Sequence, residues 1–422
     1  MTKSEIIKAA YKTWGREFYL NTSLSSVAKE LNVCKPALYR HFKNKEALLD
    51  AMTMHFIDSF TDFIRSDYEK SLECKDKSES VFTLTRSVAE YYARNIYIFI
   101  FSMIKLHNHE LDSPKTAEEL RKRGVDLVFF HHSIKKDFVF QPIIMNLIFG
   151  TLTFFMAGFH KAENSFVNPP SEKAIEKIIN AVNAIIKQGL GYCRDQIDAL
   201  DYKELEKRIE GTITGIEDDP LLKAVAEAVA EAGPWEASME QVAQHSKLSK
   251  SSLYCHFKSK QDMLYRFFNT ESLRIIEFAR KGMRQSAIPQ EQLYLGIFSV
   301  VEYLRKKPAI LITLDWLRTR RLNFKPEDAN NGKTLPEILF LFEEIDIKPL
   351  RGKKFPFEKI PVENGSKEKK QQVSPWILFL IIKTLMRKIS GQALGNVPNS
   401  DVRALYRFLT LGIESFRIGS EQ

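Results

Sequence analysis

An internal repeat constrains the fold of this 422-residue chain more than any other feature. Residues 24–49 read LSSVAKELNVCKPALYRHFKNKEALL, and residues 239–264 read MEQVAQHSKLSKSSLYCHFKSKQDML. The second segment starts 215 residues after the first (239 − 24), and ten of the 26 aligned positions are identical. The identical pairs are Val27/Val242, Ala28/Ala243, Lys35/Lys250, Leu38/Leu253, Tyr39/Tyr254, His41/His256, Phe42/Phe257, Lys43/Lys258, Lys45/Lys260 and Leu49/Leu264. Similarity at a constant offset predicts two equivalent structural units.

A second pair of similar segments lies near the end of each half. GTLTFFMAG (150–158) resembles KTLMRKISG (383–391) at an offset of 233 residues (383 − 150). The offset has therefore grown by 18 residues (233 − 215), which indicates an insertion in the second half. Residues 348–372 are rich in Lys, Pro and Gly and are predicted to form this inserted, solvated loop. DNA contact by its lysines is the alternative.

Apolar residues recur with helical spacing along the chain, and no segment shows the alternation typical of β-strands. The chain is therefore predicted to be all-α, with two tandem units. In the first copy, one helix face over about residues 3–19 carries Ile6, Ile7, Ala10, Trp14 and Phe18.

Two short helices are expected to follow. Ser23 can cap a second helix that turns Val27 and Ala28 inward. Asn32 tolerates the left-handed backbone that a tight turn needs, and a third helix over 35–42 would bury Leu38 and Phe42. Two short helices joined by a turn form a helix-turn-helix, whose second helix fits the DNA major groove.

The second copy repeats these signals. Ser238 and Gln241 have the spacing of a capping box at the start of its second helix. Ser249 is placed to cap its recognition helix. We call residues 1–50 the first reader and residues 219–265 the second reader.

The outward residues of both readers suit DNA. Lysine and arginine can reach phosphates or guanine edges, and tyrosine and histidine can hydrogen-bond phosphates. The candidate contacts of the first reader are Ser23, Ser25, Ser26, Lys35, Pro36, Ala37, Tyr39, Arg40, His41 and Lys45. Those of the second reader are Ser238, Gln241, Lys250, Ser251, Ser252, Tyr254, His256 and Lys260. A structural role for each Tyr and His of the shared Tyr-x-His-Phe sequence is the alternative.

Both readers resemble the DNA-binding region of the TetR family, whose hallmark is Val/Ile-Ala, a short turn and Leu-Tyr-x-His-Phe-x-x-Lys. The matching residues are Leu38-Tyr39-x-His41-Phe42-x-x-Lys45 and Leu253-Tyr254-x-His256-Phe257-x-x-Lys260. The resemblance implies that the first three helices of each unit bind DNA and that the remainder binds a small effector. It also implies a four-helix dimer interface from the last two helices of each unit. Here these would be 143–162 with 170–190, and 374–394 with 399–416.

The sequence departs from the family pattern at several positions. Asn32 and Lys247 stand where the family usually has glycine, and Cys34 replaces the usual capping serine. Glu240 places a negative charge where the second helix approaches phosphate, and Cys255 replaces the basic residue at Arg40. The second reader is therefore expected to bind more weakly or to recognise different bases.

Composition limits the kind of partner and the cellular compartment that the protein is expected to have. The net charge of +9 favours a polyanionic partner, although charge alone does not distinguish DNA, RNA and acidic membranes. Four separated cysteines and the absence of a leader pattern at the N-terminus predict a cytoplasmic protein. Residues 143–159 carry no charge, and a buried helix is expected there rather than a membrane span.

The first half also holds candidates for an effector pocket, namely Phe99, His107, Phe129 and Phe130. Core packing explains these aromatic residues equally well. The sequence His-x-His-Glu at 107–110 could hold a metal, but surface histidines are the simpler interpretation, so no metal and no cofactor are predicted. No phosphate loop, G-x-S-x-G, H-E-x-x-H or paired-carboxylate motif is present, so an enzyme is not expected.

The sequence therefore predicts a ligand-responsive regulator of transcription, a repressor that binds a double-stranded operator and an unknown small molecule. Its predicted segments are the first reader at 1–50, a body at 51–190, a linker at 191–218, the second reader at 219–265 and a body at 266–422. The two halves are expected to pair within one chain, with homodimerisation as the alternative. A small-molecule or protein-binding module with degenerate readers is the rival function.

Overall fold

The computed structural model describes residues 2–16, 23–107, 114–127, 142–210, 219–233, 236–320, 337–345, 373–387 and 393–416. Within these ranges the secondary structure is helical and contains no β-strand. The all-α prediction is confirmed for this part of the chain. The predicted loop at 348–372 lies outside the described residues.

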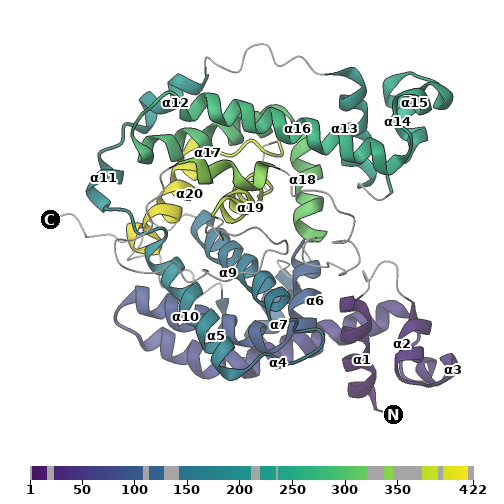
Figure 1. Ribbon diagram of the computed structural model, residues 1–422. Coiled ribbons are helices and arrows are strands. Elements are labelled where there is room, and N and C mark those ends of the chain that lie inside the picture. The colour runs from purple at the N-terminus through teal and green to yellow at the C-terminus, as the bar shows by residue number, and fades with distance from the viewer. Residues whose placement is uncertain are drawn as a thin grey trace.

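Each half begins with three reader helices and continues into a helical body (Figure 1). The first half comprises α1 (Lys3–Arg16), α2 (Leu24–Glu30), α3 (Lys35–Tyr39), α4 (Lys45–Glu73), α5 (Lys77–Arg94), α6 (Ile96–His107), α7 (Pro114–Lys122), α9 (Pro142–Ala162) and α10 (Glu172–Gln188). The second half comprises α13 (Pro220–Ala232), α14 (Met239–Ser246), α15 (Lys250–His256), α16 (Lys260–Met283), α17 (Pro289–Lys306), α18 (Pro308–Arg320), η4 (Glu337–Glu344), α19 (Ser374–Leu385), α20 (Asn399–Leu411) and η5 (Ile413–Phe416).

The repeat in the sequence recurs as a repeat in packing. Helix α1 contacts α4 and α6, and its counterpart α13 contacts α16 and α18. Helices α5 and α17 each have 18 residues and end at residues of nearly identical backbone geometry. Asn95 has φ −131° and ψ 67°, and Lys307 has φ −129° and ψ 66°. The next helix begins one residue later in both halves, so Asn95 and Lys307 are structural equivalents.

The segment expected to be a linker at 191–218 contains structure. Helices α11 (Arg194–Asp198) and α12 (Tyr202–Glu210) lie within it, and residues 211–218 are outside the described residues. Leu205 and Ile209 of α12 are buried against the second half, where α12 contacts α17. The Glu206 carboxylate accepts two hydrogen bonds of 2.7 Å from Arg403 and one of 2.6 Å from the Tyr294 hydroxyl. These contacts attach α12 to the second half.

The two halves pack against each other through their final helices. Helix α9 contacts α19 and α20, and α10 contacts α20, near the middle of the molecule (Figure 1). The Trp376 indole donates a 3.2 Å hydrogen bond to the Thr151 hydroxyl, and its ring lies 5.7 Å from that of Phe155. These are the four helices expected to form a dimer interface, and here they meet within one chain.

Helix α9 is the apolar segment that the sequence analysis singled out. Among the described residues, only Ile143–Ala162 is long and apolar enough to cross a membrane, and 67% of its most apolar window is buried inside the protein. Its packing on α19 and α20 explains this apolar character without a bilayer.

Two glycines allow the halves to approach closely where α10 and α20 end. Gly189 caps α10 with φ 56°, and Gly412 caps α20 with φ 69°. A Cβ atom at Gly189 would lie 2.5 Å from the Leu409 carbonyl oxygen and 2.7 Å from the Gly412 nitrogen. The Leu190 N–H donates a 2.7 Å hydrogen bond to that same Leu409 oxygen. The backbones of the two halves therefore touch here, which a side chain at either glycine would prevent.

Candidate nucleic-acid interface

The first reader has the predicted helix-turn-helix geometry. Val27, Leu38 and Phe42 are buried, α2 packs against α1, and α3 packs against α2. Ser23 occupies the N-cap of α2, where Ser26 Oγ accepts a 3.3 Å hydrogen bond from the Ser23 N–H. The turn residue Asn32 has φ 53°, which confirms the expected left-handed backbone.

The second reader has the same design with better caps. Ser238 Oγ accepts a 3.2 Å hydrogen bond from the Gln241 N–H, and Gln241 Oε1 accepts one of 2.8 Å from the Ser238 N–H. The predicted capping box is therefore confirmed. Ser249 caps α15 by accepting from the Ser252 N–H at 3.1 Å, as expected. Lys247 has φ 57°, a strained backbone for lysine that costs about 1–2 kcal/mol.

The recognition helix of the first reader is shorter than predicted. It was expected over 35–42, but α3 ends at Tyr39. The N–H groups of His41 and Phe42 both donate to the Leu38 carbonyl, at 2.9 and 3.0 Å, so the chain leaves the helix in a tight turn. The Cys34 side chain makes no capping hydrogen bond, unlike Ser249 in the second reader, where α15 continues to His256. The first helix, expected over 3–19, is described as α1 to Arg16, and residues 17–22 lie outside the described residues.

None of the candidate DNA contacts is buried. Tyr39 and Tyr254 are 46% and 51% exposed, which is unusual for tyrosines and leaves both rings available to a partner. The other exposed candidates are Ser23, Ser25, Lys35, Pro36, Arg40, Lys250, Ser251 and His256. The half-buried candidates are Ser26, Ala37, His41, Lys45, Ser238, Gln241, Ser252 and Lys260.

The cations of the two readers are held differently. In the first reader, Lys35 Nζ lies 5.9 Å from the Tyr39 ring centroid and Lys45 Nζ lies 5.6 Å from that of Trp14. Partial burial lowers the pKa of the Lys45 ammonium. In the second reader, Lys250 Nζ lies 3.6 Å from Glu240 Oε2. The carboxylate thus neutralises part of the charge that the second recognition helix would present to phosphate.

The predicted effector residues are only partly described. Phe99 is buried, with its ring 5.4 Å from that of Tyr92 and 5.5 Å from that of His160. Phe129 and Phe130 lie outside the described residues, as does the His107 side chain. Within the described ranges, no group of three or more His, Cys, Asp or Glu side chains is arranged to hold a metal ion.

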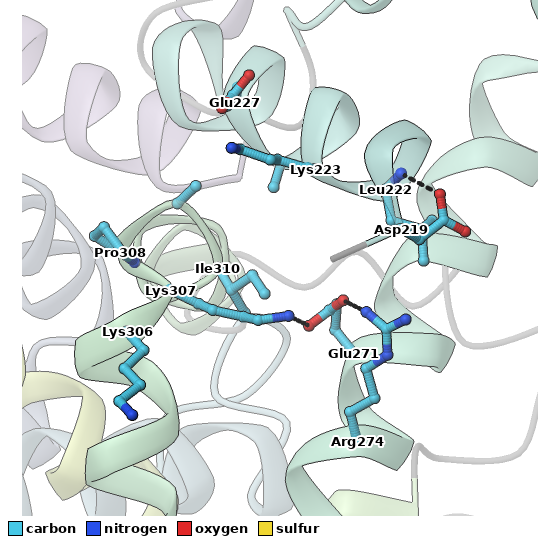
Figure 2. A pocket seen from close by; sticks show the side chains of 12 residues that line it. Asp219, Leu222, Lys223, Glu227, Glu271, Arg274, Lys306, Lys307, Pro308 and Ile310 are labelled. Carbon is cyan, nitrogen blue, oxygen red and sulfur yellow. Dashed lines mark hydrogen bonds and ion pairs between the residues drawn. The ribbon is translucent and has the colours of Figure 1, made fainter. Parts of the chain in front are cut away.

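The sequence analysis missed a cavity beside the second reader. It lies between α13 and the body and is lined by Lys223, Ala226, Glu271, Arg274 and Lys307, among others (Figure 2). The signal that could have revealed it is a difference within the repeat, because Ala226 stands where the first reader has Tyr11.

The two readers lie on the same side of the molecule, the second above the first in the view of Figure 1. Each presents a short exposed helix with a tyrosine and basic residues, supported by a buried apolar face. A short helix of this kind, displayed by a helix-turn-helix, is the arrangement that enters the DNA major groove. The fold and the interface together define a helix-turn-helix DNA-binding regulator of transcription.

Both readers match the family described as "Bacterial regulatory proteins, tetR family", over residues 6–52 and 221–266. The chain therefore carries two tandem copies of the tetR-family DNA-binding region. The resemblance seen in the sequence is confirmed.

Two relatives are regulators of transcription. The chain is 25% identical over 109 residues to IcaR of Staphylococcus epidermidis, the HTH-type negative transcriptional regulator of the biofilm operon icaADBC; the match covers 26% of this chain and 58% of IcaR. It is 32% identical over 91 residues to YuxN of Bacillus subtilis, an uncharacterized HTH-type transcriptional regulator, covering 22% and 29% of the two chains. The matches span less than two thirds of either relative.

Proposed function

We propose that the chain is a ligand-responsive repressor that acts as an intrachain pseudo-dimer and binds two unlike DNA half-sites. The observation that carries this proposal is the contact of α9 and α10 with α19 and α20 inside one polypeptide. A dimer of readers binds half-sites about 34–36 Å apart, one turn of DNA, and here a single chain supplies both readers. The sign of regulation is proposed from IcaR, which is named a negative regulator.

The interface residues favour pairing of a first half with a second half over pairing of two second halves. Gly150 and Lys383 are equivalent positions of the repeat, and they face each other, because a Cβ atom at Gly150 would lie 2.8 Å from Lys383 Cδ. A symmetric interface between two second halves would place Lys383 against Lys383. Two like charges brought together in a partly buried interface repel each other. A glycine opposite a long lysine stem avoids this repulsion.

The readers differ at the positions that would contact bases. Arg40 of the first reader can form the bidentate contact to guanine that proteins use most often, whereas Cys255 at the equivalent position cannot. Glu240 beside Lys250 also weakens the attraction of the second reader for phosphate. Two unlike half-sites, the first bound more tightly, are the expected operator.

The effector would act by favouring an arrangement in which the readers no longer match the spacing of the half-sites. Such a ligand must bind the two arrangements with different affinity. Once a ligand is known, its titration should lower operator affinity, and an unchanged affinity would contradict this part of the proposal.

The first experiment is selection of bound duplexes from a random DNA pool, followed by sequencing. Two unlike half-sites at constant spacing, bound by one chain, would support the proposal. A palindrome would indicate pairing of two chains through one kind of reader. The control variants are Tyr39→Ala and Tyr254→Ala, each expected to remove enrichment of one half-site only. No enrichment for the wild type, with no effect of Tyr39→Ala, would refute DNA reading.

A further inference from the structure

A cavity of about 280 Å³ lies between the second reader and the helical body of the second half. One wall is α13, the first helix of the second reader, and the other is formed by α16 and the junction of α17 with α18. Figure 2 shows Lys223 on α13 opposite a row of three linked side chains, Lys307, Glu271 and Arg274. The volume lies near the lower end of small-molecule sites, which begin at about 300 Å³.

At the equivalent place in the first half, aromatic side chains pack together. Tyr11 stands at the position of Ala226, and its ring lies 5.1 Å from the Phe101 ring and 5.6 Å from the His55 ring. The Tyr11 hydroxyl donates a 2.5 Å hydrogen bond to the Met52 carbonyl of α4, which closes the junction. The small Ala226 leaves that junction open in the second half.

Charged side chains surround the open space at positions where the first half has uncharged ones. Glu271 stands where the first half has Phe56, Arg274 where it has Ser59, and Lys307 where it has Asn95. Charged residues around a partly enclosed space cost desolvation energy unless they are paired with one another or bind a partner. The change is therefore specific to the second half rather than a property of the repeated fold.

The carboxylates that line the cavity already have partners. Asp219 caps α13 by accepting from the N–H groups of Leu221 and Leu222, and Glu227 Oε2 lies 3.5 Å from His245 Nδ1.

Glu271 is shared among several groups. It accepts a 2.8 Å hydrogen bond from Arg274 and one of 2.7 Å from the Tyr303 hydroxyl, and it lies 3.8 Å from Lys307 Nζ. One carboxylate therefore serves two cations, and Lys223 adds a third from the opposite wall. In all, four cations line the space (Lys223, Arg274, Lys306 and Lys307) against three carboxylates (Asp219, Glu227 and Glu271). The remaining excess of one positive charge in a partly enclosed space favours an anion.

We propose that this cavity binds a small anion bearing phosphate or carboxylate groups, held between Lys223 of the second reader and Lys307 and Arg274 of the body. The anion would bridge α13 to α16 and α17 and would thereby restrict the second reader alone. The site itself does not depend on the proposed function. Only its effect on operator binding rests on that function, with the second half-site as the one affected.

The test is a calorimetric titration of the full chain, without DNA, at constant ionic strength. The probes are inorganic phosphate, pyrophosphate and citrate, and at least one should bind saturably at one site per chain. Binding by pyrophosphate but not citrate would assign the site to phosphate-bearing ligands, and the reverse would assign it to carboxylates. Either result supports the proposal.

Three variants locate the binding. Lys223→Gln should weaken it at least tenfold, and Ala226→Tyr, which installs the residue of the first half, should abolish it. Lys8→Gln, the matched change in the first reader, should leave binding unchanged. Lys250→Gln, on the exposed face of α15, should also have no effect, which separates the cavity from the DNA-reading surface.

The proposal is overturned if none of the three anions binds, or if Lys223→Gln and Ala226→Tyr both bind as the wild type does. Because no DNA is present in the titration, its failure leaves the duplex-selection result untouched. Failure of duplex selection in turn leaves the anion site standing. Folding of each variant is checked by its helical circular dichroism, and Lys223→Gln changes an exposed side chain only.

Discussion

Replacement of Gly412 by alanine should loosen the contact between the two halves. The glycine has φ 69° and ψ −163°, a region of backbone space that is essentially restricted to glycine. Its added Cβ would also overlap the backbone of Lys187 and lie 2.5 Å from the Gln188 nitrogen. These neighbours are backbone atoms at the end of α10, so they cannot move aside as a flexible side chain could.

The expected cost has two parts. Alanine in this backbone conformation costs about 1–3 kcal/mol. Insertion of a methyl group into a packed contact costs about a further 1–3 kcal/mol. Gly124 provides the control, because it has φ 83° but nothing within 4 Å of an added Cβ. Gly124→Ala should therefore show backbone strain alone, about 1–2 kcal/mol.

The assay is urea unfolding of the full chain, with the midpoint and slope compared among variants. Gly412→Ala and its counterpart Gly189→Ala should both unfold at lower urea than Gly124→Ala. Sedimentation gives a second readout, because halves that no longer pair within the chain expose α9 and α19 to other chains. A concentration-dependent increase in mass is expected for the two interface variants and not for Gly124→Ala.

A clear result would refute this reasoning. If Gly412→Ala and Gly189→Ala unfold at the same midpoint as Gly124→Ala and keep the wild-type mass, the backbone contact between α10 and α20 does not hold the halves together. The intrachain pseudo-dimer would then depend on the packing of α9 against α19 and α20 alone.

Three further predictions follow from the readers and the body. Glu240→Gln removes the carboxylate beside Lys250 and should strengthen binding to the second half-site by about 0.2–1 kcal/mol. Glu240→Asp, which keeps the charge, is the control, and an unchanged affinity of Glu240→Gln would contradict the inference. Ser238→Ala should cost about 1 kcal/mol in urea unfolding through loss of the capping box, and Ser238→Thr should retain most of it. Burial lowers the pKa of His160 from 6.5 to about 4, so the unfolded chain binds this proton more strongly and stability is lost as the pH falls from about 6.5 to about 4. His160→Gln should flatten unfolding midpoints across that window, and equal pH dependence in both proteins would count against it.

The readers were the most predictable part of the molecule because their constraints are local. Caps at Ser238 and Ser249 depend on hydrogen bonds that span three residues, and both were predicted from spacing alone. The left-handed turn at Asn32 was predicted from its position between two short helices, and Lys247, where the family usually has glycine, has the same backbone conformation. The early end of α3 was not predicted. It arises because the N–H groups of His41 and Phe42 both donate to the Leu38 carbonyl, and residue types alone do not reveal this hydrogen-bond pattern.

The packing of α12 against the second half could not be predicted from neighbouring residues in the sequence. Its residues fall in the charged segment at 191–218, which was predicted to be a linker. The residues that hold it, Tyr294 and Arg403, are 88 and 197 positions from Glu206. Burial would raise the pKa of the Glu206 carboxyl, but hydrogen bonds from Arg403, Tyr294 and Asn399 outweigh burial and lower it. A charged residue buried with its partners gives no signal in hydropathy, because those partners are distant in sequence.

The differences between the two copies carry more functional information than their identities. Four of the ten identical pairs, Val27/Val242, Ala28/Ala243, Leu38/Leu253 and Phe42/Phe257, are buried positions that any such reader needs for its core. A fused chain no longer has to obey the symmetry of a homodimer, so each half can change on its own. Two such changes are Gly150 opposite Lys383 in the interface and Ala226, beside the second reader, at the position of Tyr11. A symmetric dimer would carry each change in both subunits. The first favours pairing of unlike halves, and the second opens a charged cavity next to one reader only. Fusion of two copies therefore permits control of one reader independently of the other.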